Sequence, residues 1–276
     1  MTDSEIKALI SLLDDTDHEV RKHVEEKISS LGDDVIPYLE DAWESSFNPN
    51  QQKQIEDLLH QLQFDKLKQK LVDWSNSEEQ DLLEGISLVA TYQYPDLDIA
   101  ETKKTVEQMY YDVWLGMKND GTPLENIKLL NEGMFYNLKF SANTKNFHAP
   151  ANSMINCVLE TKRGNPISLC VIYLLIAQKL KLPVYGVNLP NLFVLTYKDE
   201  ETQFYINVFN KGLIFSKADI DTYIEQLKLE PQEIFYSPCT NLDIVVRALR
   251  NLTVSFEKLG APEKVEEVRE LMSVLI

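Results

Sequence analysis

The sequence predicts a mostly helical α+β fold in which a buried central helix packs on a small antiparallel sheet. Three observations lead to this prediction. Apolar residues recur at helical spacing along most of the chain, residues 167–182 are apolar nearly all round, and residues 184–209 alternate between apolar and polar. We expect three parts: an acidic helical segment at 1–75, the α+β core at 76–240 and a helical hairpin at 241–276.

The first segment is predicted to hold four short antiparallel helices. Apolar residues at 6–13 and 20–31 follow helical spacing, the run DDTD separates them, and Gly32 ends the second helix. A third helix is expected at 36–43. A fourth is expected at 55–71, because the turn-forming run NPN separates it from the third.

The middle of the chain continues with helices and one polar loop. Apolar positions at helical spacing predict helices at 82–89, 106–113 and 124–138. The polar stretch 141–153 reads SANTKNFHAPANS and is expected to be a loop. A short helix at 154–160 follows it and precedes the central helix.

A change of period marks the core. Residues 167–182 read ISLCVIYLLIAQKLKL, which is apolar on every side of a helix and indicates complete burial. Strands are expected at 184–189, 193–197 and 204–209, with the polar run DEETQ forming the hairpin turn between the last two. An antiparallel sheet packed on the buried helix is the simplest core.

Two predicted helices end the chain. Apolar residues at helical spacing lie at 244–259 and 265–275, and the run GAPEK joins the two segments with Pro262 in the first turn of the second. The pair looks like one tetratricopeptide-type (TPR-like) hairpin. A single hairpin of this kind is usually a packing element.

Composition excludes several classes of function. The chain has 276 residues, a formal charge of −17 and 44% apolar residues, which is typical of an acidic globular protein. Nucleic acids and anionic membranes are not expected as partners, because neutralising phosphates needs clustered Lys and Arg. The first residues lack a basic leader with an apolar run, and the apolar stretch 167–177 is too short to span a bilayer. We therefore expect a cytoplasmic protein.

Three cysteines do not form a recognisable site. Cys157, Cys170 and Cys239 show neither a CxxC pair nor another metal-ligand spacing, so no disulfide framework or zinc site is expected. The sequence also lacks a nucleotide-binding loop and a serine nucleophile elbow. We expect no cofactor. The oligomeric state stays open.

The acidic N-terminal segment is a candidate interaction surface. Residues 1–47 carry thirteen acidic and four basic side chains, and residues 12–32, LLDDTDHEVRKHVEEKISSLG, resemble a HEAT repeat. The resemblance implies a short helical array that docks on the next domain. The concentrated negative charge separately suggests a docking face for a basic protein partner, with Trp43 and Phe47 as anchors. The alternative is an ordinary acidic hairpin that keeps the protein soluble.

Four further motifs resemble the SirB-type transglutaminase-like family. They are YPDLD at 94–98, LNEGMFYNLKF at 130–140, FHAPANSMINCVLETKRGNPISL at 147–169 and GVNLPNLF at 186–193. The resemblance covers about two thirds of the chain. It implies a transglutaminase/papain-like core, with a buried central helix on a small antiparallel sheet, between HEAT-like N-terminal and TPR-like C-terminal helices.

The resemblance also implies positions for a catalytic triad. Such enzymes use a Cys at the start of the central helix, a His on the next strand and an Asp or Asn that orients the His. In this sequence the nucleophile position falls between Pro166 and Ser168, and Ser168 is taken for it. The positions of the base and of the orienting residue hold Leu192 and Asn207. A triad without its base predicts a non-catalytic protein, which we expect to be an interaction or regulatory module.

An alternative function is a cysteine hydrolase or acyltransferase that pairs Cys170 or Cys157 with His148, the histidine of the polar loop. The competing interpretation treats Cys170 as a small apolar residue in a buried helix and His148 as a loop residue with a local hydrogen bond.

The loop before the central helix supplies candidate binding residues. Polar side chains at a buried helix N-terminus can bind an anion or a carbonyl group. Capping the helix and fixing its entry turn is at least as good an explanation. The candidates are Asn152, Ser153, Arg163 and Asn165.

Overall fold

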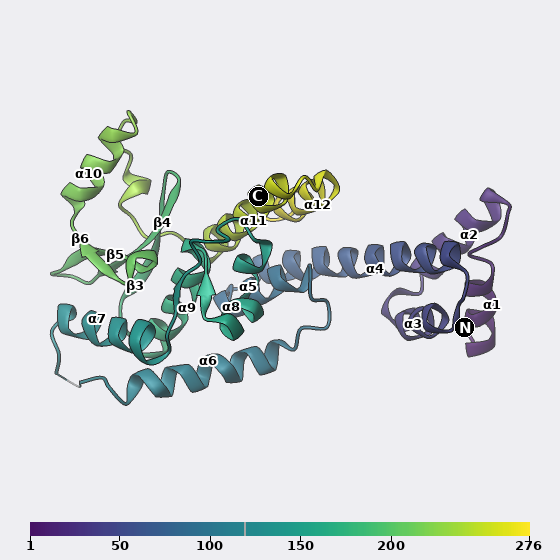
Figure 1. Cartoon of the computed structure of the whole chain (residues 1–276), viewed down its shortest axis with the longest axis horizontal. Coiled ribbons are helices and arrows are strands. Elements are labelled where there is room, and N and C mark those ends of the chain that lie inside the picture. Colours follow the sequence, from purple (N-terminus) through teal and green to yellow (C-terminus); the bar gives the residue numbers. More distant parts are fainter. Residues whose placement is uncertain (119) are drawn as a thin grey trace. The chain divides into compact units, whose positions relative to one another are not determined.

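The computed structural model describes residues 1–118 and 120–276 and is mostly helical with two small sheets. The chain divides into two compact units, Met1–Lys70 and Leu71–Ile276. The first is formed by N-terminal helices, and the second holds both sheets and the remaining helices (Figure 1). The expected three-part division with boundaries at residues 75 and 240 stays a prediction.

The first unit contains α1 (Asp3–Ser11), α2 (His18–Ser29), the 3-10 helix η1 (Gly32–Val35), α3 (Ile36–Ser45) and most of α4 (Pro49–Ser75). Side-chain caps explain where the first two helices begin, because Thr2 and Asp17 accept hydrogen bonds from N–H groups of the first turn. The fully buried core includes Leu13, Ile28 and Leu39. The prediction of four short helices is wrong for α4, which is 27 residues long.

Three helices of the second unit were predicted from apolar spacing. They are α5 (Leu82–Thr91), α6 (Ile99–Trp114) and α7 (Pro123–Glu132), and they begin at the side-chain caps Asp81, Asp98 and Thr122. The π-helix η2 (Gly133–Asn137) follows α7 directly and explains why the periodicity extended to residue 138.

The central helix is α9 (Pro166–Lys179), and every residue from 167 to 177 is buried. This confirms the prediction made from its continuous apolar sequence. Before it lie the 3-10 helix η3 (Pro150–Ser153) and the short helix α8 (Ile155–Thr161). Two short strands, β1 (Ser141–Ala142) and β2 (Arg163–Gly164), pair in parallel and tie the start of the polar loop to the residues before α9.

An antiparallel sheet of four strands packs on α9 through β3 and β4 (Figure 1). The strands are β3 (Val184–Leu189), β4 (Leu192–Lys198), β5 (Gln203–Asn207) and β6 (Leu213–Phe215), paired in that order. The first three confirm the predicted strands, except that residues 208 and 209 belong to a 3-10 helix and not to β5, and β6 is an addition. Pairing of Leu189 with Leu192 leaves a two-residue turn, in which Asn191 has a φ of 59°.

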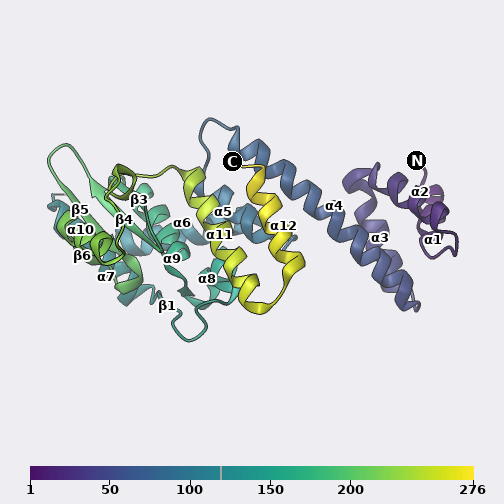
Figure 2. The same cartoon turned by 90° about the horizontal axis from the view of Figure 1, so that it is seen from above.

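Helices complete the second unit. After the sheet come the 3-10 helix η4 (Val208–Asn210, between β5 and β6), α10 (Lys217–Gln226) and the 3-10 helix η5 (Glu233–Phe235). The last pair, α11 (Asn241–Leu259) and α12 (Pro262–Ser273), confirms the two predicted C-terminal helices, and α11 packs on α5 and α9 (Figure 2). Across residues 1–118 and 120–276, none of the helices combines the length and apolar character that a membrane span requires.

Candidate functional site

The start of α9 is closed by a reciprocal cap. The side-chain oxygen of Asn165 accepts the backbone N–H of Ser168 at 2.9 Å, and the hydroxyl of Ser168 accepts the backbone N–H of Asn165 at 3.0 Å. Both residues are buried, with 4% and 8% of their surface exposed. The residue at the position expected for a nucleophile therefore acts as a helix cap.

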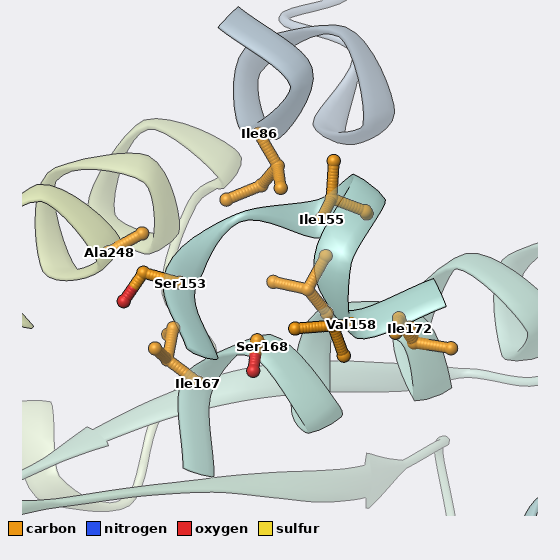
Figure 3. A pocket seen from close by; sticks show the side chains of 9 residues that line it. Ile86, Ser153, Ile155, Val158, Ile167, Ser168, Ile172 and Ala248 are labelled. Atoms are coloured by element: carbon orange, nitrogen blue, oxygen red, sulfur yellow. The ribbon is translucent and has the colours of Figure 1, made fainter. Parts of the chain in front are cut away.

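Apart from the hydrogen bonds of its hydroxyl to the backbone of Asn165, Ser168 lies mostly among apolar side chains. Figure 3 shows Ser168 and Ser153 among residues of α5, α8, α9 and α11. The cavity that these residues enclose has a volume of about 10 Å³, roughly the volume that one water needs. A substrate acyl group has no room at this position. The apolar walls include Ile86, Ile155, Val158 and Ile167.

The other two triad positions also have structural partners. Leu192 begins β4 and packs on a buried cluster that includes Val187 and Tyr205. The side-chain oxygen of Asn207 accepts the backbone N–H of Asn210 at 3.1 Å and caps η4. Neither side chain supplies a base, and the amide of Asn207 is used by its own turn.

Two of the three cysteines are held in the protonated state by burial. Cys170 is fully buried in α9, where its Sγ lies 3.8 Å from the carbonyl oxygen of Phe193. Burial raises the pKa of the Cys170 thiol well above its usual value, and the nearby Cys239 adds to the increase. Burial likewise raises the pKa of Cys239 to about 12. Such thiols are poor nucleophiles near neutral pH.

The third cysteine and the loop histidine contact different partners. The thiol of Cys157 donates a hydrogen bond to the hydroxyl oxygen of Tyr94 at 3.2 Å. The ring of His148 packs edge-on against Phe147 at 5.1 Å between centroids. Within the part of the chain that the structure describes, no hydrogen bond joins His148 to a cysteine. The alternative Cys–His pair stays a prediction.

Three of the four predicted binding residues organise the loop itself. The amide nitrogen of Asn152 donates to the carbonyl oxygens of Asn146 and Phe147 at 2.7 and 3.0 Å. The amide nitrogen of Asn165 donates to the hydroxyl of Ser153 at 3.0 Å. Arg163, the fourth, lies exposed in β2. The polar side chains of Asn152, Ser153 and Asn165 therefore form hydrogen bonds within the protein.

A larger pocket lies beside the start of α9. Its volume is about 110 Å³, several times the roughly 10–15 Å³ that one water occupies. It is bounded by the polar loop, the start of α9, the β3–β4 turn and one face of α11. Its lining includes Phe147, His148, Asn191, Phe193, Arg247 and Asn251.

Sequence reasoning missed the contribution of α11 to this pocket. Arg247, Asn251 and Ser255 recur every four residues, so they share one face of the helix. This row of polar residues, on a helix that otherwise buries apolar side chains, is the sequence pattern that could have indicated a polar pocket wall. The described residues hold no cluster of three or more His, Cys, Asp or Glu able to bind a metal ion.

Comparisons with known proteins place the chain in a family. A family model described as the transglutaminase-like superfamily matches residues 100–250. A UPF0162 protein of Xylella fastidiosa strain Temecula1 is 29% identical over 200 residues, which cover 65% of this chain and 68% of the relative. The corresponding alignment with strain 9a5c is 30% identical and covers 62% of this chain and 63% of that relative.

A shorter similarity extends to a eukaryotic protein. F-box only protein 21 of Homo sapiens is 32% identical over 105 residues, which cover 35% of this chain but only 17% of that protein. This likeness concerns a part of each chain. No solved structure matches the chain.

Proposed function

This chain belongs to the transglutaminase-like superfamily, and we propose that it is a non-catalytic member that works as a protein-interaction or regulatory module. The single observation that carries the proposal is the fate of the nucleophile position. Ser168 is buried, capped and enclosed by apolar side chains. The position expected for the base holds Leu192, so no imidazole is available to activate a nucleophile there.

The finer assignments belong to the same proposal. We assign the chain to the SirB-type branch of the superfamily, with residues 1–75 as a HEAT-like segment and residues 241–276 as a TPR-like hairpin. The sequence motifs around Gly164 and Pro190 support the branch, and the paired helices at both ends are compatible with the repeat assignments. Ser168, Leu192 and Asn207 then form a degenerate triad.

The partner proposed for the module is a basic protein that binds the acidic N-terminal helices. Charge complementarity supports this choice, because the first 47 residues carry nine more acidic than basic side chains. The side chain of Phe47 is fully exposed and offers an apolar anchor beside that charge. A cytoplasmic location is part of the same proposal.

The test is alkylation of the native protein with identification of the modified residue. A module without a nucleophile reacts slowly at every cysteine near pH 6. Rapid modification of Cys170 or Cys157 at that pH instead supports the alternative function, a cysteine hydrolase or acyltransferase that uses His148 as base. Cys170→Ala and Cys157→Ala variants assign the labelled site.

A further inference from the structure

The pocket of about 110 Å³ beside α9 contains a cation without a carboxylate partner. Arg247 of α11 is partly buried, and its Nη1 donates a single long hydrogen bond of 3.4 Å to the side-chain oxygen of Asn188. Among residues 1–118 and 120–276, no Asp or Glu lies within ion-pair distance of it. Arg269 of α12 gives the contrast, since it pairs with Glu257 and Glu266.

The unpaired state of Arg247 is costly in a chain with so many carboxylates. Burial lowers the pKa of its guanidinium, and the neighbouring Arg250 lowers it further. Arginine nevertheless stays charged in proteins, so the desolvation of this cation is compensated only by the long hydrogen bond to Asn188 and by the nearby Tyr223. A formal charge of −17 supplies many possible partners elsewhere on the chain, yet none is placed here. An anion that enters the pocket compensates the charge.

The other walls of the pocket suit a small organic anion. None of its lining residues is acidic. The side-chain amides of Asn191 and Asn251 have no hydrogen-bond partner in the described part of the chain and add neutral donors. Phe147 and Phe193 provide aromatic surface for an apolar body.

We propose that this pocket binds the carboxylate of a small organic acid or of a peptide C-terminus, with Arg247 as the anchor. The planar guanidinium presents two parallel N–H donors, which match the two oxygens of a carboxylate. One partly buried cation balances one negative charge, so a doubly charged phosphate is disfavoured. The inference rests on the proposed function, because a cleft without a nucleophile retains such a ligand without converting it.

The experiment titrates the full chain with benzoate and with its neutral isostere benzamide, by isothermal calorimetry. We expect benzoate to bind with a dissociation constant in the millimolar range or below, and benzamide to bind at least about tenfold more weakly, because it lacks the charge that Arg247 compensates. Arg247→Gln is expected to weaken benzoate binding by about tenfold or more. Arg250→Gln removes the same charge from the exposed face of the same helix and is expected to bind benzoate like the native chain.

A second variant guards against a folding defect in Arg247→Gln. Asn251→Asp places a carboxylate one helical turn from Arg247, where it can form an ion pair with the guanidinium and block the binding of an anion. We expect this variant to keep the native thermal transition and to lose benzoate binding by about tenfold or more. Equal binding by native chain, Arg247→Gln and Asn251→Asp overturns the proposal.

Two further probes separate the sources of the carboxylate. The peptide Gly-Gly-Phe is compared with the same peptide amidated at its C-terminus. Binding of the free acid that is tighter than that of benzoate identifies a peptide C-terminus, and the reverse order identifies a small acid. Equal binding of acid and amide, tighter binding of inorganic phosphate, or no heat with benzoate at about 10 mM contradicts the inference.

The carboxylate-binding experiment and the cysteine alkylation experiment can fail independently. Failure of the proposed function appears as a cysteine that alkylates rapidly near pH 6, whatever the pocket binds. Failure of the present inference appears as carboxylate binding that ignores Arg247, with the cysteines still inert.

Discussion

Asn165 holds the entry to the central helix with both ends of its side chain. Its oxygen caps the N–H of Ser168, and its nitrogen donates to Ser153. We expect Asn165→Ala to lower the free energy of unfolding by about 2–3 kcal/mol, because the cap is lost and the buried Ser153 hydroxyl loses its donor. Urea unfolding followed by tryptophan fluorescence measures the change.

Thr122 provides the matched control for this prediction. It makes a similar reciprocal cap with Glu125 at the start of α7, but both residues are exposed. Thr122→Ala is therefore expected to cost only about 1 kcal/mol. Equal costs for the two variants contradict the claim that the cap of α9 is reinforced by a buried network.

At the level of single residues, the sequence indicated which triad positions are degenerate but not how the site is built. Leu192 and Asn207 were recognised because motif spacing is local. Arg247 was missed because it lies 80 positions or more from Asn165, and only packing of α11 brings it to the pocket. The hydrogen bonds of Asn152 were equally invisible, since a polar loop sequence does not state whether its amides face the loop or a ligand.

The turn before β6 depends on the conformation of one glycine, Gly212. Gly212 has a φ of +72°, and its carbonyl oxygen accepts a hydrogen bond of 2.9 Å from the amide of Asn131. Asn131 also accepts the hydroxyl of the fully buried Tyr173 at 2.9 Å. A methyl group on Gly212 would come within 2.0 Å of the side-chain oxygen of Asn131.

The substitution Gly212→Ala is expected to cost about 3 kcal/mol or more of unfolding free energy. About 1 kcal/mol comes from the left-handed backbone, and the rest from displacing Asn131 and stranding the Tyr173 hydroxyl. Gly260→Ala is the matched control, because its φ of +69° is similar and nothing lies within 4 Å of the added carbon. The two variants are compared by urea unfolding, and a difference below about 0.5 kcal/mol contradicts the role given to Asn131.

Elements with a strong period were predictable, and short or polar ones were not. The central helix and the strands β3 to β5 follow from burial and alternation. The strand β6 has three residues, too few to display alternation. The helix α10 buries only Ile220 and Ile224, so its sequence carries almost no apolar stripe. The helix α4 begins before its first apolar position. Its first turn is polar and exposed or half-buried, so the apolar spacing did not indicate the true start.

The stability of the molecule as a whole is expected to fall in alkaline solution. The native state keeps the proton of Cys170 because burial raises the pKa of that thiol, whereas the unfolded chain releases it above the usual value of 9.0. Unfolding then releases a proton, so the stabilisation is complete below pH 9 and declines as the pH rises. The contribution of Cys170 is expected to fall by about 1.4 kcal/mol between pH 8 and pH 10.

The variant Cys170→Ala isolates this contribution. Its destabilisation relative to the native chain is expected to shrink by that same amount between the two pH values, as measured by urea unfolding at each pH. Cys157→Ala, which changes a partly exposed thiol, serves as the control for other groups that titrate in this range. A destabilisation by Cys170→Ala that is constant with pH contradicts the burial of a protonated thiol.

The central claim for the whole molecule is that its transglutaminase-like core lacks a working nucleophile. The most direct measurement is the alkylation rate of each cysteine with iodoacetamide, in native and in urea-unfolded protein from pH 5 to pH 9, with the modified residues assigned by mass spectrometry. We expect Cys170 and Cys239 to react in the unfolded chain and to stay protected in the native protein across this range, because burial raises the pKa of both thiols. We also expect Cys157 to react slowly near pH 6, since its thiol donates a hydrogen bond to the Tyr94 hydroxyl and not to a base. Rapid modification of any cysteine in the native protein near pH 6 contradicts the claim.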